Sequence, residues 1–138
     1  MADILVIDDD PQMRRALISV LKRMGHVVHE ASSGNEGITR FQQTQPALVV
    51  CDIVMPDGEG IQTIQALRRQ APSVPILAIS GVGARGLYLR AATALGAAAT
   101  LEKPFSAQTL RATIKDLLKA VETDASAGSG CGASPSSK

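Results

Sequence analysis

The stretch Ile4-Leu5-Val6-Ile7-Asp8-Asp9-Asp10 decides the fold of this chain. Its four apolar residues, mostly β-branched, are typical of a strand that is buried on both faces of a parallel sheet. Pro11 follows immediately and suits the first turn of a helix, for which Asp10 can serve as the N-cap. The segment therefore predicts a buried strand that ends in acidic residues and continues directly into a helix.

The same order of strand and helix recurs along the rest of the chain. Short apolar runs predict strands around residues 27–28, 47–51, 75–79 and 97–101. Apolar residues at helical spacing follow each run, with capping or stop signals at Gly25, Ser33, Gly96 and Ser106. Five strand–helix units in strict alternation predict an α/β fold, a doubly wound five-stranded parallel sheet with helices on both faces.

The chain changes character after residue 122. From Thr123 onward it consists mainly of Ala, Gly, Ser and Pro and shows no hydrophobic periodicity. We therefore expect one folded domain over residues 1–122 and a flexible tail or truncated linker over residues 123–138.

Composition and charge narrow the class of protein. The formal net charge of +1 argues against a dedicated nucleic-acid surface. No apolar run reaches the roughly 18 residues that a membrane span requires. The chain starts without a basic and apolar leader, which indicates a cytoplasmic protein. We therefore expect direct contact with neither nucleic acid nor membrane.

Chemically active side chains follow four of the five predicted strands. Asp8 and Asp9 follow the first strand, Asp52 the third, Ser80 the fourth and Lys103 the fifth. Ligands of doubly wound sheets bind at the carboxyl ends of the strands, so we expect these side chains to meet at one edge. Any one of them alone is explained more simply as a helix cap or a loop residue. Their common position at strand ends favours a shared site.

Three carboxylates at one edge create a charge problem that suggests the chemistry. Two of them about 4 Å apart repel by about 4 kcal/mol at an effective dielectric near 20. A hard cation such as Mg²⁺ removes this cost and can bridge to a phosphoryl oxygen. Asp52 follows the middle strand and precedes a loop, so we assign it as the nucleophile toward phosphorus. We assign Asp8 and Asp9 to the cation, and Lys103 and Ser80 to the other phosphoryl oxygens.

Four stretches of the chain resemble the receiver domain of bacterial two-component response regulators, in particular the stand-alone chemotaxis regulators. They span nearly all of residues 3–122 and are Ile4-Leu5-Val6-Ile7-Asp8-Asp9-Asp10, Asp52-Ile53-Val54-Met55-Pro56-Asp57-Gly58, Ile79-Ser80-Gly81 and Lys103-Pro104-Phe105. The resemblance implies a flavodoxin-like (βα)5 fold with strand order 2-1-3-4-5. It also implies that the chain is a signalling domain and not an enzyme. The only chemistry of such a domain is self-catalysed phosphotransfer and slow autodephosphorylation.

The resemblance also implies partners for this reaction. A sensor histidine kinase or a phosphotransfer protein would donate the phosphoryl group to Asp52 in a Mg²⁺-dependent reaction. The signal would pass through the face made by the fourth helix, the fifth strand and the fifth helix. It would reach a downstream protein target, or an output domain removed after residue 122. A homodimer through this face is compatible with the resemblance.

Specific roles follow from the same resemblance. Asp9, Asp52 and the backbone carbonyl of Val54 would ligate Mg²⁺, with Asp8 acting partly through water. Ser80 and Lys103 would contact the phosphoryl group. The Lys103-Pro104 peptide, in the loop after the fifth strand, is often cis in this family.

Two positions depart from the family pattern. The family usually has Tyr or Phe three residues before the strand-five lysine, where its rotamer reports phosphorylation, and this chain has Thr100. The coupling from Ser80 to the outer face is therefore expected to be weaker or built differently. The loop 57–60 lacks its customary bulky apolar residue, which favours a more mobile loop.

Three competing functions stay open at the level of sequence. The stretch Gly81-Val82-Gly83-Ala84-Arg85-Gly86 matches a dinucleotide-binding motif, but it follows the fourth strand and leaves the acidic residues unexplained. A phosphatase of the haloacid-dehalogenase type would use Asp8 as its nucleophile, although the chain is short for that family. A phosphorylation-independent adaptor with the receiver fold is compatible with Thr100. Arg14 and Arg15 suit either a solvated helix face or docking of a kinase helix.

Overall fold

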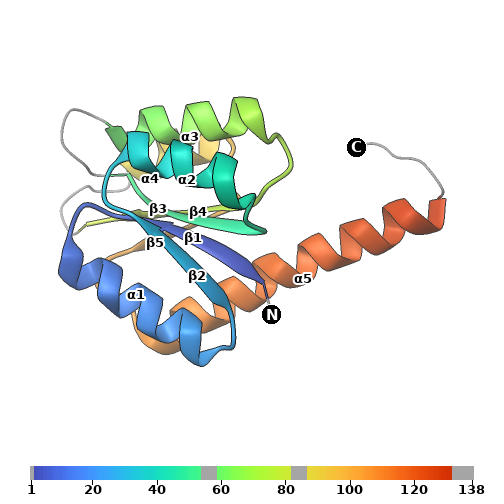
Figure 1. Cartoon of the computed structure of the whole chain (residues 1–138), viewed down its shortest axis with the longest axis horizontal. Helices are drawn as coiled ribbons and strands as arrows, with labels where there is room; N and C mark the ends of the chain where they lie inside the picture. Colours follow the sequence, from blue (N-terminus) through green and yellow to red (C-terminus); the bar gives the residue numbers. More distant parts are fainter. Residues whose placement is uncertain (1, 54–58, 82–86, 132–138) are drawn as a thin grey trace.

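The computed structural model describes residues 2–53, 59–81 and 87–131 of the chain. Five strands and five helices alternate in them (Figure 1). The strands are β1 (Asp3–Ile7), β2 (Val27–Ala31), β3 (Leu48–Asp52), β4 (Ile76–Ser80) and β5 (Ala99–Glu102). The helices are α1 (Pro11–Arg23), α2 (Gly34–Thr44), α3 (Glu59–Gln70), α4 (Leu87–Ala94) and α5 (Ala107–Cys131). All strand pairs are parallel and their order is β2-β1-β3-β4-β5, which confirms the predicted fold class and strand order.

The sheet separates two apolar layers, because successive side chains of a strand point to opposite faces. Leu17 and Leu21 of α1 share one layer with Leu110 and Ile114 of α5. The other layer lies under α2, α3 and α4, and Figure 1 shows these three helices together on one side of the sheet. The strands β3 and β4 are buried along their whole length, which explains their uninterrupted apolar sequences.

This alternation also determines which polar side chains face each other at the carboxyl edge. Alternate residues Ile4 and Val6 of β1, and Leu48 and Val50 of β3, belong to the α1–α5 layer. The next residue in each of these two series is acidic, namely Asp8 and Asp52. In β5 the corresponding series of Ala99 and Leu101 leads to Lys103. Two carboxylates and one ammonium group are therefore directed to the same side of the same edge.

The start of α1 is held by the residues that the sequence suggested. Asp10 is the N-cap, and its Oδ1 accepts a hydrogen bond from the backbone N–H of Gln12 at 3.0 Å. Pro11 occupies the first helical position. Gly25, just after the helix, has φ +92°, a conformation that favours glycine. The cap brings the Asp8–Asp10 segment close to the first turn of α1.

The last helix is longer than we expected. It continues to Cys131, whereas the sequence suggested that the periodic part ends near residue 122. Figure 1 shows its C-terminal part extending away from the sheet. The segment from residue 107 to 131 contains no proline, and its first glycine is Gly128, so helical geometry can continue where side-chain periodicity has stopped. The division into a domain over 1–122 and a tail over 123–138 stays a prediction.

No helix in the described part of the chain is both long enough and apolar enough to cross a membrane.

A glycine at the start of α3 permits the close approach of this helix to the end of β3. A Cβ at Gly60 would press on the Cα of Ile53 and lie 2.6 Å from the carbonyl oxygen of Asp52. These are backbone atoms and cannot rotate away. We expect Gly60→Ala to lower the free energy of unfolding by about 2 kcal/mol through overpacking, measured by urea denaturation.

Gly81→Ala is the matched control, because a Cβ there would meet no atom of the described residues within 4 Å. It should change stability by less than about 1 kcal/mol. Equal stabilities of the two variants would show that the approach of α3 to Ile53 is not tight in solution.

Candidate metal centre

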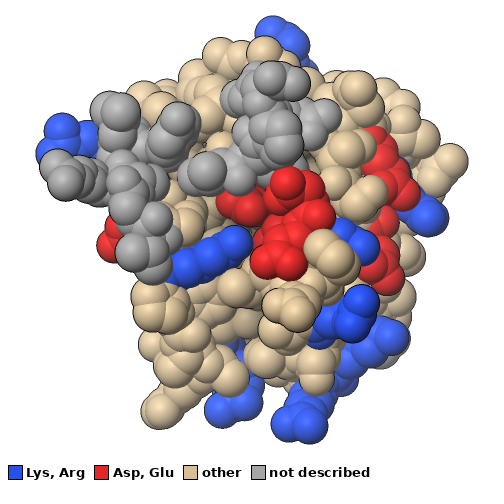
Figure 2. All heavy atoms as spheres, turned by 90° about the vertical axis from the view of Figure 1, so that its left-hand side faces the viewer, with Lys and Arg blue, Asp and Glu red and all other residues tan. Residues whose placement is uncertain are grey.

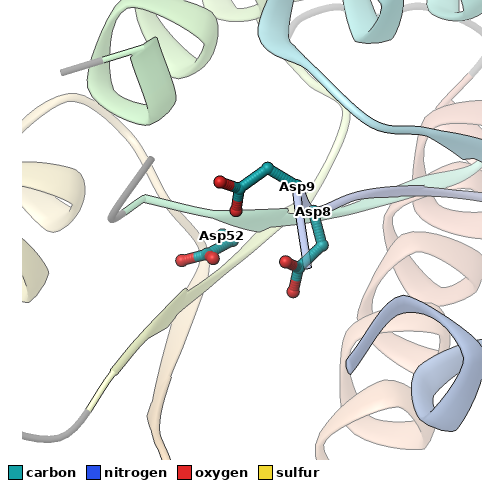
Figure 3. Close-up of side chains that lie close together, drawn as sticks. All are labelled: Asp8, Asp9 and Asp52. Atoms are coloured by element: carbon teal, nitrogen blue, oxygen red, sulfur yellow. The ribbon is translucent and has the colours of Figure 1, made fainter. Parts of the chain in front are cut away.

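Three carboxylates converge at the carboxyl edge of the sheet. Asp8 and Asp9 follow β1, and Asp52 is the last residue of β3. The two strands pair in a register that places Ile7 opposite Cys51, so the acidic residues come next to each other at the strand ends. Each of the three side chains offers an oxygen, and these oxygens lie within 4.8 Å of one another. Figure 3 shows the three side chains grouped around the ends of these two strands. The arrangement brings together all three acidic residues that the sequence singled out.

The ammonium group of Lys103 contacts two of these carboxylates. Its Nζ lies 3.6 Å from Oδ2 of Asp52 and 3.8 Å from Oδ2 of Asp8. The alternation of side chains described above explains why the lysine meets these two residues. The Lys103-Pro104 peptide is cis, as the resemblance suggested. Figure 2 shows a group of Asp and Glu side chains on the surface of the molecule, with Lys and Arg side chains beside it.

The three carboxylates differ in their access to solvent. Asp8 is fully buried and Asp52 is 5 % exposed, whereas Asp9 is exposed. Burial raises the pKa of Asp8 to about 6, with the negative charge of Asp52 acting in the same direction. A hydrogen bond from the backbone N–H of Asp10 and the charge of Lys103 act to lower that pKa. The net result is a buried carboxyl group that resists ionisation.

The donor set of this site fits a hard divalent cation. Oδ1 of Asp8 accepts a bond of 2.9 Å from the N–H of Asp10. Oδ2 of Asp8 is buried and accepts no hydrogen bond within the described part of the chain. Such an oxygen, beside two other carboxylates, needs a positive charge larger than one lysine supplies. Oxygen donors of this kind are those that Mg²⁺ prefers. The Val54 carbonyl that the resemblance added to this set lies outside the described residues.

Ser80 lies at the end of β4 and is fully buried. Its carbonyl oxygen accepts a bond of 2.7 Å from the backbone N–H of Lys103, which links the ends of β4 and β5. By strand alternation, its side chain is directed to the face opposite that of Asp52 and Lys103. The structure thus places Ser80 at the carboxyl end of β4, where its hydroxyl donates to the carbonyl oxygen of Gly81 at 3.4 Å.

Thr100 is not part of this cluster. It is half-buried in β5, paired with Ala78 of β4, two residues before the strand end. Ala78 belongs to the apolar layer that includes Ala92 of α4. The position is therefore suited to linking β4 with α4, as the family pattern suggests for the residue there.

Sequence reasoning did not find the role of Arg14 next to this site. Its Nη1 donates to the carbonyl oxygen of Asp8 at 2.8 Å, and its Nε donates to Oε1 of Glu30 at 2.8 Å. Neither contact follows from the helical periodicity of α1. The available signal was a cation in the first turn of a helix, where the helix dipole disfavours positive charge.

The raised pKa of Asp8 predicts an unusual pH dependence of stability. The unfolded chain ionises Asp8 near its ordinary pKa of 3.8, and the folded protein does so near pH 6. The contribution of Asp8 to the free energy of unfolding should therefore fall as the pH rises from about 4 to about 6. In EDTA, Asp8→Asn should be more stable than the wild type by about 2 kcal/mol above pH 6, and the two should converge near pH 4.

Thermal unfolding of both proteins across this pH range is the measurement, and Asp116→Asn, at an exposed position of α5, is the control. The control should show no such pH-dependent gain. A metal-free Asp8→Asn protein that is less stable than the wild type at pH 8 would contradict the account of this buried carboxyl group.

Comparison with known proteins places this arrangement in a family. The model of the response regulator receiver domain matches residues 4–115. The chemotaxis protein CheY of Thermotoga maritima is 31% identical over 103 residues, which cover 74% of this chain and 85% of that protein. A probable transcriptional regulator, ycf27 of Cyanophora paradoxa, is 37% identical over 119 residues, 86% of this chain. The chain spans about half (49%) of the length of that regulator.

Solved structures agree with the sequence matches. The receiver domain of NtrX from Brucella abortus superposes with a TM-score of 0.80 at 28% identity, covering 85% of this chain and 98% of that one. The family match therefore covers most of the chain, including the parallel sheet and the acidic cluster at its carboxyl edge. This chain belongs to the response regulator receiver domain family, the phosphorylation-dependent signalling domains of two-component systems.

Proposed function

We propose that Asp52 accepts a phosphoryl group from a histidine kinase or a phosphotransfer protein, in a reaction that requires Mg²⁺ held by Asp8, Asp9 and Asp52. The observation that supports this most directly is the position of Lys103, whose Nζ lies 3.6 Å from Asp52 and 3.8 Å from Asp8. A cation at this place can bind an oxygen of a group transferred to Asp52.

The roles of the side chains follow from charge. An oxygen of the Asp52 carboxylate attacks phosphorus, and the P–N bond of a donor phosphohistidine breaks as the new O–P bond forms. The electron pair of that bond leaves with the imidazole, which takes up a proton. Lys103 holds one phosphoryl oxygen by its charge, and the Ser80 hydroxyl donates to another. When bound, Mg²⁺ would neutralise charge on the acidic cluster and on the phosphoryl oxygens.

Signal output follows from the new charge at Asp52. Phosphorylation takes the Asp52 side chain from one negative charge to about two at neutral pH. We infer that Ser80 and the end of β4 move toward these oxygens and bias the face made by α4, β5 and α5. The backbone bond from Lys103 to Ser80 ties β5 to this movement. Thr100, which replaces the usual aromatic residue, would transmit the change with a smaller side chain. The partner that binds this face is a downstream protein or an output domain.

The first test is covalent labelling. Incubation with acetyl phosphate and Mg²⁺ should add one phosphoryl group, about 80 Da by intact mass. The addition should be absent in Asp52→Asn and in EDTA. Asp8→Asn should reduce the rate of labelling and keep Asp52 as the site.

Labelling that persists in Asp52→Asn but disappears in Asp8→Asn would contradict the assignment of the nucleophile. Sustained hydrolysis of acetyl phosphate that is lost on Asp8→Asn but kept in Asp52→Asn would point instead to a phosphatase.

The second test separates the role of Lys103 from that of the metal. Lys103→Met removes the positive charge that compensates Asp8 and Asp52, so the acidic cluster should bind Mg²⁺ more tightly. The same change removes a donor to the phosphoryl group, so labelling at saturating Mg²⁺ should slow by at least about 100-fold. Calorimetric titration with Mg²⁺ and the time course of labelling measure the two effects.

A Lys103→Met protein that is labelled at the wild-type rate would remove Lys103 from the mechanism. Lys115→Met, at an exposed position of α5, is the control for the loss of one lysine and should change neither quantity.

A further inference from the structure

One side chain outside the acidic cluster makes a direct contact with its backbone. Arg14 lies in the first turn of α1, where its own backbone N–H donates to the carbonyl oxygen of Asp10 at 2.9 Å. Its guanidinium turns back toward the strand end and donates through Nη1 to the carbonyl oxygen of Asp8 at 2.8 Å. Through Nε it donates to Oε1 of Glu30, just before the end of β2, at 2.8 Å. The Arg14 side chain is 18 % exposed and that of Glu30 is 56 % exposed, so the contact with the Asp8 carbonyl is partly protected from water and the contact with Glu30 is open to it.

The position of Arg14 is electrostatically unfavourable in the absence of these contacts. The N-terminal end of a helix carries a partial positive charge, which disfavours a cation in the first turn. The first turn of α1 contains no acidic residue, although Asp10 places a carboxylate at the N-cap. The contacts with Glu30 and with the Asp8 carbonyl add compensation directly at the guanidinium. A guanidinium, with several donors in a fixed plane, can satisfy both acceptors at once.

The contact with Asp8 fixes the peptide group between two of the carboxylates. The Asp8–Asp9 peptide is planar, so the direction of the Asp8 carbonyl also sets the direction of the Asp9 N–H and Cα. Asp8 is buried on the other side of this peptide, where its N–H donates to the carbonyl of Ala31 at 3.1 Å. Asp9, in contrast, is exposed and follows the end of the strand. Its approach to Asp52 therefore depends on the orientation of the peptide that Arg14 holds.

We propose that Arg14 is a positioning residue for the acidic cluster: by holding the Asp8 carbonyl it pre-orients Asp9 toward Asp52, and Glu30 neutralises the guanidinium so that its charge does not oppose a divalent cation. The proposal rests on the proposed function, because it concerns the binding of Mg²⁺ to that cluster. The end of β2 thus contributes to the site indirectly, because Glu30 binds Arg14 although it is not one of the three carboxylates of the cluster.

The sign of one measurement separates positioning from charge. If Arg14 acted by its charge alone, Arg14→Ala would remove a cation near the cluster and would tighten Mg²⁺ binding. If it positions Asp9, the same change weakens binding. We expect a loss of about 10-fold in Mg²⁺ affinity, as for the removal of residues that orient metal ligands, measured by calorimetric titration of the full chain.

Labelling by acetyl phosphate gives a second readout. The Mg²⁺ concentration for half-maximal labelling should rise by a similar factor of about 10, and the maximal rate at saturating Mg²⁺ should stay within about twofold of the wild type. The control is Arg15→Ala, which removes the same charge from the next position of α1. Arg15 is exposed, and its side chain makes no hydrogen bond or ion pair within the described part of the chain. The control should leave the affinity within about twofold.

Two conservative variants keep the test valid if Arg14→Ala is poorly folded. Arg14→Lys keeps the charge but cannot contact both acceptors in the same geometry, so its Mg²⁺ affinity should lie between those of the wild type and Arg14→Ala. Glu30→Gln keeps an acceptor for Nε and loses only the charge, so its affinity should fall by less than about threefold. Circular dichroism in EDTA establishes that each variant is folded.

The outcomes distinguish this inference from the function on which it rests. A wild-type protein that binds no Mg²⁺ and is not labelled overturns the proposed function, and this inference with it. The other case is a wild-type protein that binds Mg²⁺ and is labelled. If a folded Arg14→Ala or Arg14→Lys variant then binds Mg²⁺ at least as tightly as the wild type, this inference alone is overturned. A variant that is less stable but unchanged in Mg²⁺ affinity would reduce Arg14 to a structural role.

Discussion

Mutual repulsion of three carboxylates at one edge of the sheet is the constraint on which the site depends. Two such charges about 4 Å apart cost about 4 kcal/mol at an effective dielectric near 20. The pKa of Asp8 is raised to about 6, mainly by burial and to a lesser extent by the charge of Asp52. Lys103 compensates part of the charge through contacts to both residues. The remainder makes the cluster a receptor for a divalent cation and, through that cation, for a dianionic group. The arrangement is thus unfavourable on its own and favourable in the presence of the ligands that the function requires.

The fold holds this unfavourable cluster together through register rather than through contacts among the charged groups. Parallel pairing of β1 with β3 aligns Ile7 with Cys51, which places the following Asp8 and Asp52 side by side. Alternation of side chains directs Lys103 to the same face, and the backbone bond from Lys103 to Ser80 ties the end of β5 to that of β4. The buried apolar strands supply the free energy that keeps these ends in place, since each fully buried Ile or Leu contributes about 1.5–3 kcal/mol. Chemistry and packing are therefore separated along β1, β3, β4 and β5, where the apolar residues come first and the reactive residue lies at or just after the strand end.

Much of this arrangement could be predicted because both patterns are local. The apolar runs that end at Asp8, Asp52 and Ser80 identified the strands, and the shared carboxyl edge of a parallel sheet brought the acidic residues together. Contacts made by long side chains across elements were not predictable in this way. The guanidinium of Arg14 donates to the Asp8 carbonyl. That of Arg68 in α3 donates to the carbonyls of Ala71, Pro72, Val74 and Gly96. The hydrophobic periodicity of the sequence does not indicate the acceptors of either arginine. The extent of α5 was missed for a different reason, because a helix without an apolar stripe leaves no periodic signal. The Val54 carbonyl lies outside the described residues, so its role is still a prediction.

The most direct test of the central claim is a crystal structure grown with Mn²⁺ in place of Mg²⁺, read from the anomalous difference map. The account predicts one strong peak at the carboxyl edge of the sheet, about 2.2 Å from oxygens of Asp9 and Asp52, and Lys103 still beside Asp52. A map in which these carboxylates carry no peak at saturating Mn²⁺, or in which the ion lies elsewhere and Asp52 points away from Asp9, would contradict it.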